Sequence, residues 1–343
     1  MVASAGVPFH PTATVVVGLL RKRAGSGQLL LGELVGVLAK QNITLAGRLA
    51  ERLGLIGPEG ALSSVIEPVG AAEVDFAAFC DAGAREAERM GSPAVLCEHL
   101  LLGLLRIGES EGAESDTAQP DAEQRTGLRS LADAVPLAQA RREFQLLRAE
   151  RAFTEYEKVP PVLRPADAEQ PFVVLVAGVP GTGKSTLAEA LAVELRAPVF
   201  SADWQFGALV PFGAIRNDNG GPLGDVMLTA MTVRQLQLGL SVILDTTGHE
   251  AQIRRRWRSL AERHGGRFVG VECVCSDESA HRGRVEGRVR GIPGWPSTVT
   301  WEHVGRMQGL WEHWDEPHLV IDSAVTDPEA ALRCVLDEIR AEQ

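Results

Sequence analysis

The hydrophobic pattern of the chain changes character about half-way along its length. From residue 13 to residue 107, apolar residues recur at three- and four-residue steps, which predicts helices. Helical periodicity returns from about Leu128 to Glu157 and stops at the proline-rich stretch 158–171, which we interpret as an interdomain linker. The sequence therefore predicts a helical domain over residues 1–157 and a second domain over residues 172–343.

The second domain alternates short apolar runs with helical segments. Five runs are strand candidates, at residues 171–178, 197–203, 240–248, 267–277 and 318–324. Helical patterns separate them, for example at 223–239 and 251–264. Because strands that alternate with helices form parallel sheets, we expect an α/β domain with a mostly parallel five-stranded sheet, preceded by an all-α domain.

Composition and charge narrow the functional classes. The formal net charge is −11, which argues against a nucleic-acid partner because phosphate binding needs a basic surface. No apolar run approaches the roughly 20 residues of a membrane span, and the start of the chain lacks the basic residues of a signal peptide. The five cysteines show no metal-ligand spacing and are typical of a reducing compartment. We therefore expect a cytoplasmic protein with no membrane association.

The strongest chemical signal follows the first strand candidate, where the sequence fits GxxxxGK[ST] and leads into a helix. Glycines let backbone N–H groups turn toward phosphate oxygens, and the helix adds its positive end. The residues expected to contact a nucleotide's phosphates are Gly178, Pro180, Gly181, Thr182, Gly183, Lys184, Ser185 and Thr186. Lys184 is expected to reach the β- and γ-phosphates and Ser185 to ligate Mg²⁺. An ordinary strand–turn–helix is the alternative, which the scarcity of lysine in the chain disfavours.

Two aspartates close later strand candidates. Asp203 ends the second, where a carboxylate can accept the proton of an attacking hydroxyl; a helix N-cap is the alternative. Asp245 ends the third and resembles the aspartate that holds Mg²⁺ in P-loop proteins; a loop-capping turn is the alternative. Thr246 stands where a motor ATPase would carry a second acidic residue. Asp245 is also a candidate contact of the substrate.

Several other side chains are candidates for the acceptor pocket and for a lid. Arg284 and Arg288 are four residues apart, so on one helix they would share a face and could clamp phosphates; a solvated basic face is the alternative. Trp204 flanks Asp203 and could contact a flat or sugar-like substrate, with core packing as the alternative. Asp218 lies in the turn-rich segment 216–225 and is a reserve candidate for the base and for substrate binding.

The order of these motifs resembles the zeta-toxin-like P-loop kinases of the AAA_33 type, a group that includes chloramphenicol phosphotransferase. The resemblance covers about half of the chain and includes VILDTTGHEAQIRRRWRSLAERHG and ECVCSDESAHRGRVEGR. It implies that residues 178–186 bind nucleotide phosphates, that Asp203 is the general base, and that Arg284 and Arg288 are lid arginines. Polynucleotide kinases of the group carry an arginine shortly after the base. This chain has Trp204-Gln205-Phe206 there, which argues against a phosphorylated or nucleic-acid acceptor.

The N-terminal half carries a second resemblance. Residues 76–109 combine an Ala/Glu-rich helix, a Gly-x-Pro turn and Glu-His-Leu-Leu-Leu-Gly-Leu-Leu, and are similar to a repeat of the N-terminal domain of Clp-type unfoldases. Residues 28–38 and 98–108 share a Leu-Leu-Leu-Gly core, which predicts an internal duplication. The resemblance implies a helical module that binds adaptors or polypeptide and has no catalytic activity. In front of a kinase domain, such a module could cap the acceptor pocket, mediate homodimerisation or bind a protein partner.

These expectations favour an enzyme that binds ATP or GTP with Mg²⁺ and transfers the γ-phosphoryl group to a small-molecule hydroxyl. An antibiotic of the chloramphenicol or nucleoside kind is a sensible acceptor, given the family resemblance. A polynucleotide 5′-hydroxyl kinase or a toxin-type kinase of nucleotide sugars is the first alternative. A Clp-like ATPase or a nucleotide-binding regulatory module is the second.

Overall fold

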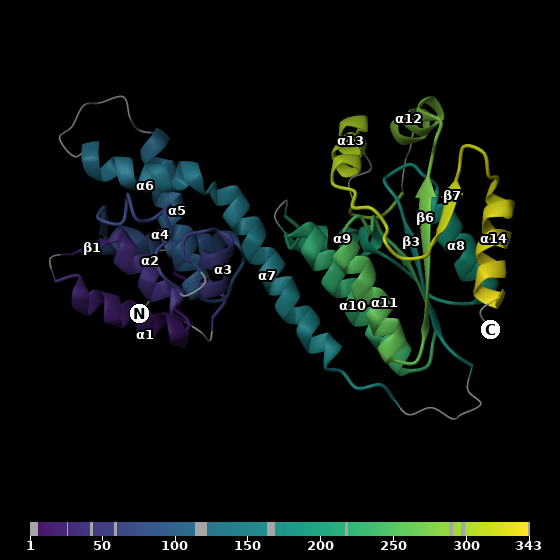
Figure 1. The fold of residues 1–343 in the computed structure, drawn as a ribbon, viewed down its shortest axis with the longest axis horizontal. Helices are drawn as coiled ribbons and strands as arrows, with labels where there is room; N and C mark the ends of the chain where they lie inside the picture. Colours follow the sequence, from purple (N-terminus) through teal and green to yellow (C-terminus); the bar gives the residue numbers. More distant parts are fainter. Residues whose placement is uncertain are drawn as a thin grey trace. The chain divides into compact units, whose positions relative to one another are not determined.

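The computed structural model describes residues 6–25, 27–41, 44–57, 60–113, 122–162, 169–216, 219–287, 291–295 and 299–341. The chain divides into two compact units, Met1–Glu150 and Arg151–Gln343. The division falls inside helix α7 (Leu137–Glu157). Figure 1 shows the first unit as a helical body and the second as a sheet flanked by helices. The domain boundaries expected at residues 157 and 172 stay predictions.

The N-terminal unit is helical, as the periodicity predicts. Its helices besides α7 are α1 (Pro11–Arg23), α2 (Leu31–Ala39), α3 (Ala46–Arg52), α4 (Phe76–Arg89), α5 (Cys97–Ala113) and α6 (Ala122–Ala134). The unit also contains two short antiparallel strands, β1 (Gln28–Leu30) and β2 (Glu73–Asp75), so it is not all-α. Each strand buries one residue, Leu29 or Val74. A three-residue strand is too short for alternation to be recognisable in the sequence.

The short strand β1 lies within one of the two stretches that the sequence predicts to be an internal duplication. Residues 28–30 form β1, whereas the matching residues 98–100 lie within helix α5. The two stretches therefore begin in different secondary structure and share only the helix that follows. The internal duplication stays a prediction.

A fully buried carboxylate joins three helices of this unit. Glu86 on α4 accepts hydrogen bonds from Arg141 on α7 at 2.6 and 2.8 Å and from Arg106 on α5 at 2.7 Å. Burial by itself raises the pKa of Glu86, but the two arginines outweigh burial and leave that pKa below its usual value. The ion triad therefore depends on an ionised Glu86.

The C-terminal unit is built on a five-stranded parallel sheet, which confirms the predicted α/β fold. Its strands are β3 (Phe172–Ala177), β4 (Val199–Ser201), β5 (Val242–Asp245), β6 (Arg267–Val274) and β7 (Leu319–Asp322). They lie in the order β4-β5-β3-β6-β7, and every neighbouring pair is parallel. All six residues of β3 are buried, which explains why its sequence is a continuous apolar run.

Helices cover both faces of this sheet (Figure 1). They are α8 (Lys184–Leu195), α9 (Ala202–Leu209), α10 (Gly220–Gln237), α11 (Ala251–Arg263), α12 (Glu278–Glu286), α13 (Trp301–Gly309) and α14 (Pro328–Ala341). Helices α8 and α14 pack together against β3, β5 and β6, and α10 and α11 contact the same central strands. None of the helices in the described ranges is long and apolar enough to cross a membrane.

The strand order places a crevice at one edge of the sheet. After the central strand β3, the chain adds β4 and β5 on one side and then β6 and β7 on the other. In doubly wound sheets, ligands bind where this reversal occurs, outside the carboxyl ends of the strands. The loop after β3 and Asp245 at the end of β5 both lie at that edge.

Replacing Glu86 by alanine leaves the largely buried guanidinium of Arg141 without its carboxylate, so we expect the free energy of unfolding of the N-terminal unit to fall by about 3 kcal/mol at neutral pH. The lowered pKa makes this contribution fully present above the usual value of 4.5, and it is lost as the pH falls through the lowered value. Urea unfolding measures both effects.

The probes separate the two units, because all six tryptophans lie in the C-terminal unit. Glu86→Ala should shift the transition seen by far-UV circular dichroism and leave the tryptophan fluorescence transition in place. Glu88→Ala, at an exposed position of the same helix, is the matched control. Equal effects of the two substitutions would contradict the role given to the ion triad.

Candidate functional site

The loop between β3 and α8 needs glycine for two separate reasons. Gly181 and Gly183 have φ angles of 90° and 92°, in the left-handed region that favours glycine. The second reason is space, because a Cβ on Gly181 would lie 2.5 Å from Val285 of α12. A Cβ on Gly178 would lie 2.5 Å from the carbonyl oxygen of Cys273 on β6. The loop backbone is therefore pressed between β6 and α12.

A small cavity opens at the amino end of α8. It has a volume of about 170 Å³ and is lined by Gly181, Gly183, Lys184, Ser185, Thr186 and Arg284. Backbone N–H groups and the positive end of a helix both favour an anion at such a place. Two cationic side chains add to that preference. The structure thus gathers the predicted phosphate loop and one predicted lid arginine around one space.

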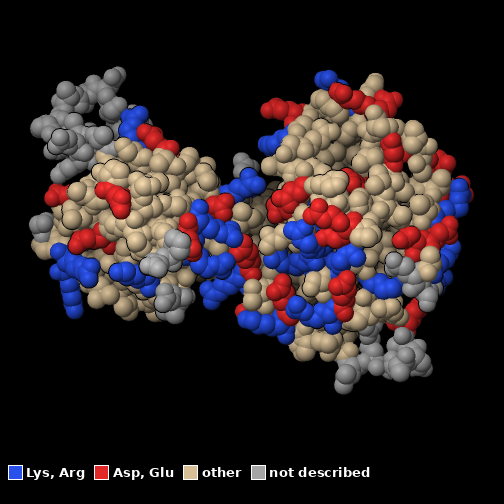
Figure 2. Space-filling model, in the orientation of Figure 1, with Lys and Arg blue, Asp and Glu red and all other residues tan. Residues whose placement is uncertain are grey.

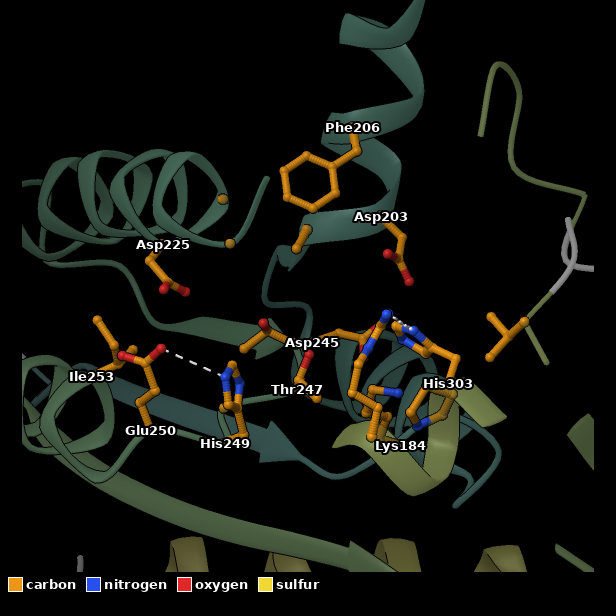
Figure 3. Close-up of a pocket in the computed structure, with 18 of the residues that line it drawn as sticks. Lys184, Asp203, Phe206, Asp225, Asp245, Thr247, His249, Glu250, Ile253 and His303 are labelled. Atoms are coloured by element: carbon orange, nitrogen blue, oxygen red, sulfur yellow. Dashed lines mark hydrogen bonds and ion pairs between the residues drawn. The ribbon is translucent and has the colours of Figure 1, made fainter. Parts of the chain in front are cut away.

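A larger cavity of about 520 Å³ adjoins it and is lined by Lys184, Asp203 and Asp245, among others. Figure 3 shows Asp203 and Lys184 on the same side of this space, with Asp245 between them and the far end. The expectation that Asp203 ends a strand is wrong, because β4 stops at Ser201 and Asp203 lies in the first turn of α9. An acidic residue in a first turn is stabilised by the helix dipole.

Two buried oxygen atoms near the phosphate loop have no hydrogen-bond donor among the described residues. They are Oγ of Ser185 and Oδ1 of Asp245, and both residues line a neighbouring cavity of about 430 Å³. A buried oxygen without a partner is costly unless a ligand satisfies it. A hydroxyl and a carboxylate oxygen are also ligands that Mg²⁺ prefers. These two residues therefore fit a magnesium ion.

The predicted arginine pair is only half described. Arg284 on α12 donates hydrogen bonds to Oγ and the carbonyl oxygen of Ser323, at 2.7 and 3.0 Å. This pairing holds the guanidinium at the loop that follows β7. Helix α12 ends at Glu286, and Arg288 lies outside the described residues, as does Asp218.

Helices α12 and α13 pack directly on the phosphate loop. His281 of α12 forms a 2.8 Å hydrogen bond with the carbonyl oxygen of Pro180, and its ring meets Trp301 of α13 edge-on at 5.1 Å between centroids. Val179, Val285 and Val304 form a small apolar cluster between the loop and the two helices. Helices α12 and α13 thus contact the loop through both polar and apolar groups.

Helix α13 brings three residues into the larger cavity that the sequence did not identify, Glu302, His303 and Arg306. Burial lowers the pKa of His303, the neighbouring Arg306 lowers it further, and Asp203 opposes both. A neutral imidazole therefore lies in the field of the Asp203 carboxylate. No local sequence motif marks these residues as part of the site.

The aromatic residues divide between the two cavities. Trp204, the predicted substrate contact, is 56% exposed and lines the cavity that contains Ser185 and Asp245. Phe206, on the same helix, lines the larger cavity, and Trp295 packs on it at 5.2 Å between ring centroids. The aromatic wall of the larger cavity is therefore formed by Phe206 and Trp295.

The end of the larger cavity away from Lys184 is acidic. Figure 3 shows Asp225 of α10 facing Glu250 and His249, which precede α11. Burial raises the pKa of Asp225 to about 7; the charge of Glu250 adds to this rise, and Arg256 opposes it. Asp225 belongs to the segment predicted as a loop over the acceptor, but that segment contains the start of α10. The Gly-His-Glu run after the third strand candidate is the local signal for the other two residues.

One buried arginine braces this end of the cavity. Arg254 is 1% exposed and donates hydrogen bonds to the carbonyl oxygens of Gly248, His249, Glu312 and His313, at 2.7 to 3.0 Å. Its guanidinium also lies 4.6 Å from the ring centroid of Trp314. The carboxylate of Glu312 accepts a hydrogen bond from the backbone N–H of Ala251, the first residue of α11. The backbone N–H of Glu312 donates to the carbonyl oxygen of His249.

The outer surface of the C-terminal unit carries mixed charge. On the face shown in Figure 2, basic and acidic side chains alternate over short distances. Independently of this view, Arg255 of α11 pairs with Asp315 at 3.4 Å, so its charge is balanced by a neighbouring carboxylate. This face therefore offers no basic stripe of the kind that binds a nucleic-acid backbone.

Residues 173–312 match the model of the AAA_33 family, an AAA domain. The AAA_33 segment runs from β3 to Glu312 and so contains the phosphate loop, Asp203, Asp245 and Arg284. It confirms the AAA_33-type assignment of the C-terminal half that the motif order predicts. A comparison with curated proteins gave no match.

Solved structures of several kinases resemble about half of the chain. A putative kinase from Chloroflexus aurantiacus is 22% identical, covers 49% of this chain and 98% of its own, and has a TM-score of 0.40. A gluconokinase from Sinorhizobium meliloti 1021 is 19% identical, with 51% and 98% covered and a TM-score of 0.35. The APS kinase CysC of Mycobacterium tuberculosis, in complex with AMPPNP and APS, is 18% identical, with 53% and 99% covered and a TM-score of 0.34.

The Arg254 brace yields a stability prediction. Arg254→Met leaves buried carbonyl oxygens without donors, so we expect the free energy of unfolding of the C-terminal unit to fall by at least about 2 kcal/mol. Tryptophan fluorescence during urea unfolding reports on this unit. Arg255→Met, which removes an exposed arginine one residue away, should change the value by less than about 0.5 kcal/mol. If the two variants behave alike, Arg254 does not brace the site.

Proposed function

We propose that the C-terminal unit is a phosphotransferase that uses ATP or GTP with Mg²⁺ and transfers the γ-phosphoryl group to a hydroxyl of a small molecule. The observation that carries this proposal is the common cavity of Lys184 and Asp203, next to the phosphate loop. A phosphate-binding cation and a candidate base on one space are what phosphoryl transfer to a hydroxyl requires. The AAA_33 match of this segment supports the proposal.

In this mechanism the loop residues and Lys184 hold the β- and γ-phosphates, and Arg284 adds positive charge at the same cavity. Mg²⁺, held by Ser185 and Asp245, supplies further charge neutralisation when bound. The acceptor oxygen forms a bond to the γ-phosphorus while the bond from that phosphorus to the β–γ bridging oxygen breaks. Asp203 accepts the proton of the acceptor hydroxyl. The second product is the nucleoside diphosphate.

The larger cavity sets the size and character of the acceptor. Its volume of about 520 Å³ falls in the range that small-molecule sites occupy. Phe206 and Trp295 give it an aromatic wall, which suits a ring-bearing substrate. An antibiotic of the chloramphenicol or nucleoside kind meets both conditions, and its phosphorylation would give resistance. A polynucleotide 5′-hydroxyl or a nucleotide sugar is the alternative acceptor.

The N-terminal unit has a separate proposed role. We infer that it is a helical module similar to the N-terminal domain of Clp-type unfoldases and that it binds a protein partner or mediates homodimerisation. Its helical architecture and the repeat-like residues 76–109 support this role. The Glu86 ion triad joins three helices of this unit, α4, α5 and α7.

Two substitutions separate nucleotide binding from chemistry. Lys184→Ala should abolish measurable binding of ATP and GTP, because it removes the cation on the β- and γ-phosphates. Asp203→Asn should leave nucleotide affinity unchanged and lower kcat by about 10²–10⁴-fold, the usual contribution of a general base. Calorimetry measures the first effect, and mass spectrometry of phosphorylated acceptors from an antibiotic panel measures the second.

The control is Asp337→Asn, an exposed aspartate on α14. It should match the wild type in both assays. Full nucleotide affinity in Lys184→Ala would overturn the proposed site, and normal turnover in Asp203→Asn would remove Asp203 from the role of base. Phosphorylation of 5′-hydroxyl oligonucleotides in preference to the panel would establish the alternative acceptor.

A further inference from the structure

The larger cavity has two chemically different ends. Lys184 and Asp203 lie at one end, where the nucleotide's γ-phosphate is proposed to react, and Asp225 and Glu250 face each other at the other (Figure 3). Among the described residues that line the cavity, five are carboxylates and two, Lys184 and Arg306, are permanent cations. An acceptor with negative charge would therefore enter an already negative space.

Both cations lie at the end of the cavity where phosphoryl transfer is proposed to occur. Lys184 belongs to the phosphate loop, and Arg306 contacts His303, whose ring lies near Asp203. Arg256 is the arginine whose charge lowers the pKa of Asp225, but its side chain does not line the cavity. It pairs with Glu157 at 3.6 Å and stacks on Phe153 at 3.8 Å from the ring centroid. No permanent cation among the described lining residues thus serves the far end.

Asp225 and Glu250 are poorly compensated within the protein. Asp225 forms no hydrogen bond or ion pair with any other described residue, and Glu250 lies 3.5 Å from His249. Two carboxylates that share one end of a cavity repel each other, and a neutral hydroxyl group cannot offset that repulsion. An ammonium group can, because it offers positive charge and several N–H donors at once.

We propose that the acceptor is a hydroxylated amine, such as an amino sugar or an amino-substituted nucleoside, and that Asp225 and Glu250 bind its protonated amine. This inference rests on the proposed function in taking the ligand of the cavity to be the acceptor. The amine anchors the molecule at the far end and leaves a hydroxyl free to point toward Asp203. The two carboxylates then determine specificity and take no part in proton transfer.

The pH dependence of binding follows from the groups around Asp225. Burial raises the pKa of Asp225 to about 7, Glu250 on the loop before α11 adds to this rise, and Arg256 opposes it. His249 lies at the same end of the cavity, with its Nε2 atom 3.5 Å from Oε1 of Glu250. Below that pKa the carboxyl of Asp225 is protonated and neutral; above it the carboxyl is ionised. The affinity for an ammonium ligand should therefore increase from about pH 6 to about pH 8, whereas a ligand that accepts a hydrogen bond from the neutral acid would show the opposite trend.

Ethanolamine, the simplest hydroxylated amine, tests the site without knowledge of the natural acceptor. Ligand-observed NMR on the full chain, saturated with a non-hydrolysable ATP analogue, compares ethanolamine with neutral N-acetylethanolamine and anionic glycolate. We expect saturable binding of ethanolamine, at least about tenfold tighter than that of the other two probes. Asp225→Asn and Glu250→Gln should each weaken ethanolamine binding by about tenfold.

Glu302→Gln is the matched control, because Glu302 is an exposed carboxylate that lines the same cavity from α13. It should change the affinity by less than about twofold, since solvent screens its charge. Asp225→Asn removes a charge that burial and Glu250 disfavour, so at pH 8 this variant should unfold at a temperature no lower than the wild type. A loss of binding in Asp225→Asn is then not a loss of folding.

Three results would overturn the inference: no saturable ethanolamine binding, equally tight binding of N-acetylethanolamine or glycolate, or unchanged affinity in both carboxylate variants. Failure of the proposed function looks different. If ethanolamine binds as expected but no hydroxylated amine is phosphorylated, the amine site stands and the phosphotransferase is wrong. If neutral acceptors are phosphorylated and ethanolamine does not bind, the phosphotransferase stands and the amine site is wrong.

Discussion

The contact between the phosphate loop and its neighbours is the constraint on which the rest of the C-terminal unit depends. The loop backbone passes so close to β6 and α12 that neither Gly178 nor Gly181 has room for a Cβ. Because the loop backbone lies so close, His281 of α12 can contact the loop, and Trp301 of α13 can pack against His281. Arg284 on α12 and His303 on α13 are therefore carried by helices that pack on this stretch of backbone.

Environment, and not residue type alone, assigns roles within the larger cavity. Burial and Arg306 lower the pKa of His303, so an imidazole beside Asp203 stays neutral. Burial and Glu250 raise the pKa of Asp225, at the end of the cavity away from Lys184. Divergent pKa values within one site are the usual sign that its groups perform different tasks. No sequence motif records the surroundings that shift the pKa values of His303 and Asp225.

Much of the fold could be predicted, because buried parallel strands are continuous apolar runs and glycine-rich turns follow them. The structure confirms all five strand candidates and the loop that leads into α8. Other features could not be predicted from the sequence, for physical reasons. The segment from Gly220 to Asp225 reads as a turn but begins α10, since glycine and proline are tolerated in a first helical turn. His303 and Arg306 reach the cavity only through tertiary packing, which periodicity cannot reveal.

The Arg254 brace links parts of the chain that lie about sixty residues apart in sequence. Its four carbonyl partners come from the turn before α11 and from the segment after α13, and Glu312 returns the connection to α11. Because every residue type offers a backbone carbonyl oxygen, the contacts place demands on the path of the two segments and not on their side chains. If the turn alone were transplanted into a related protein, its sequence would be retained but its backbone conformation would not.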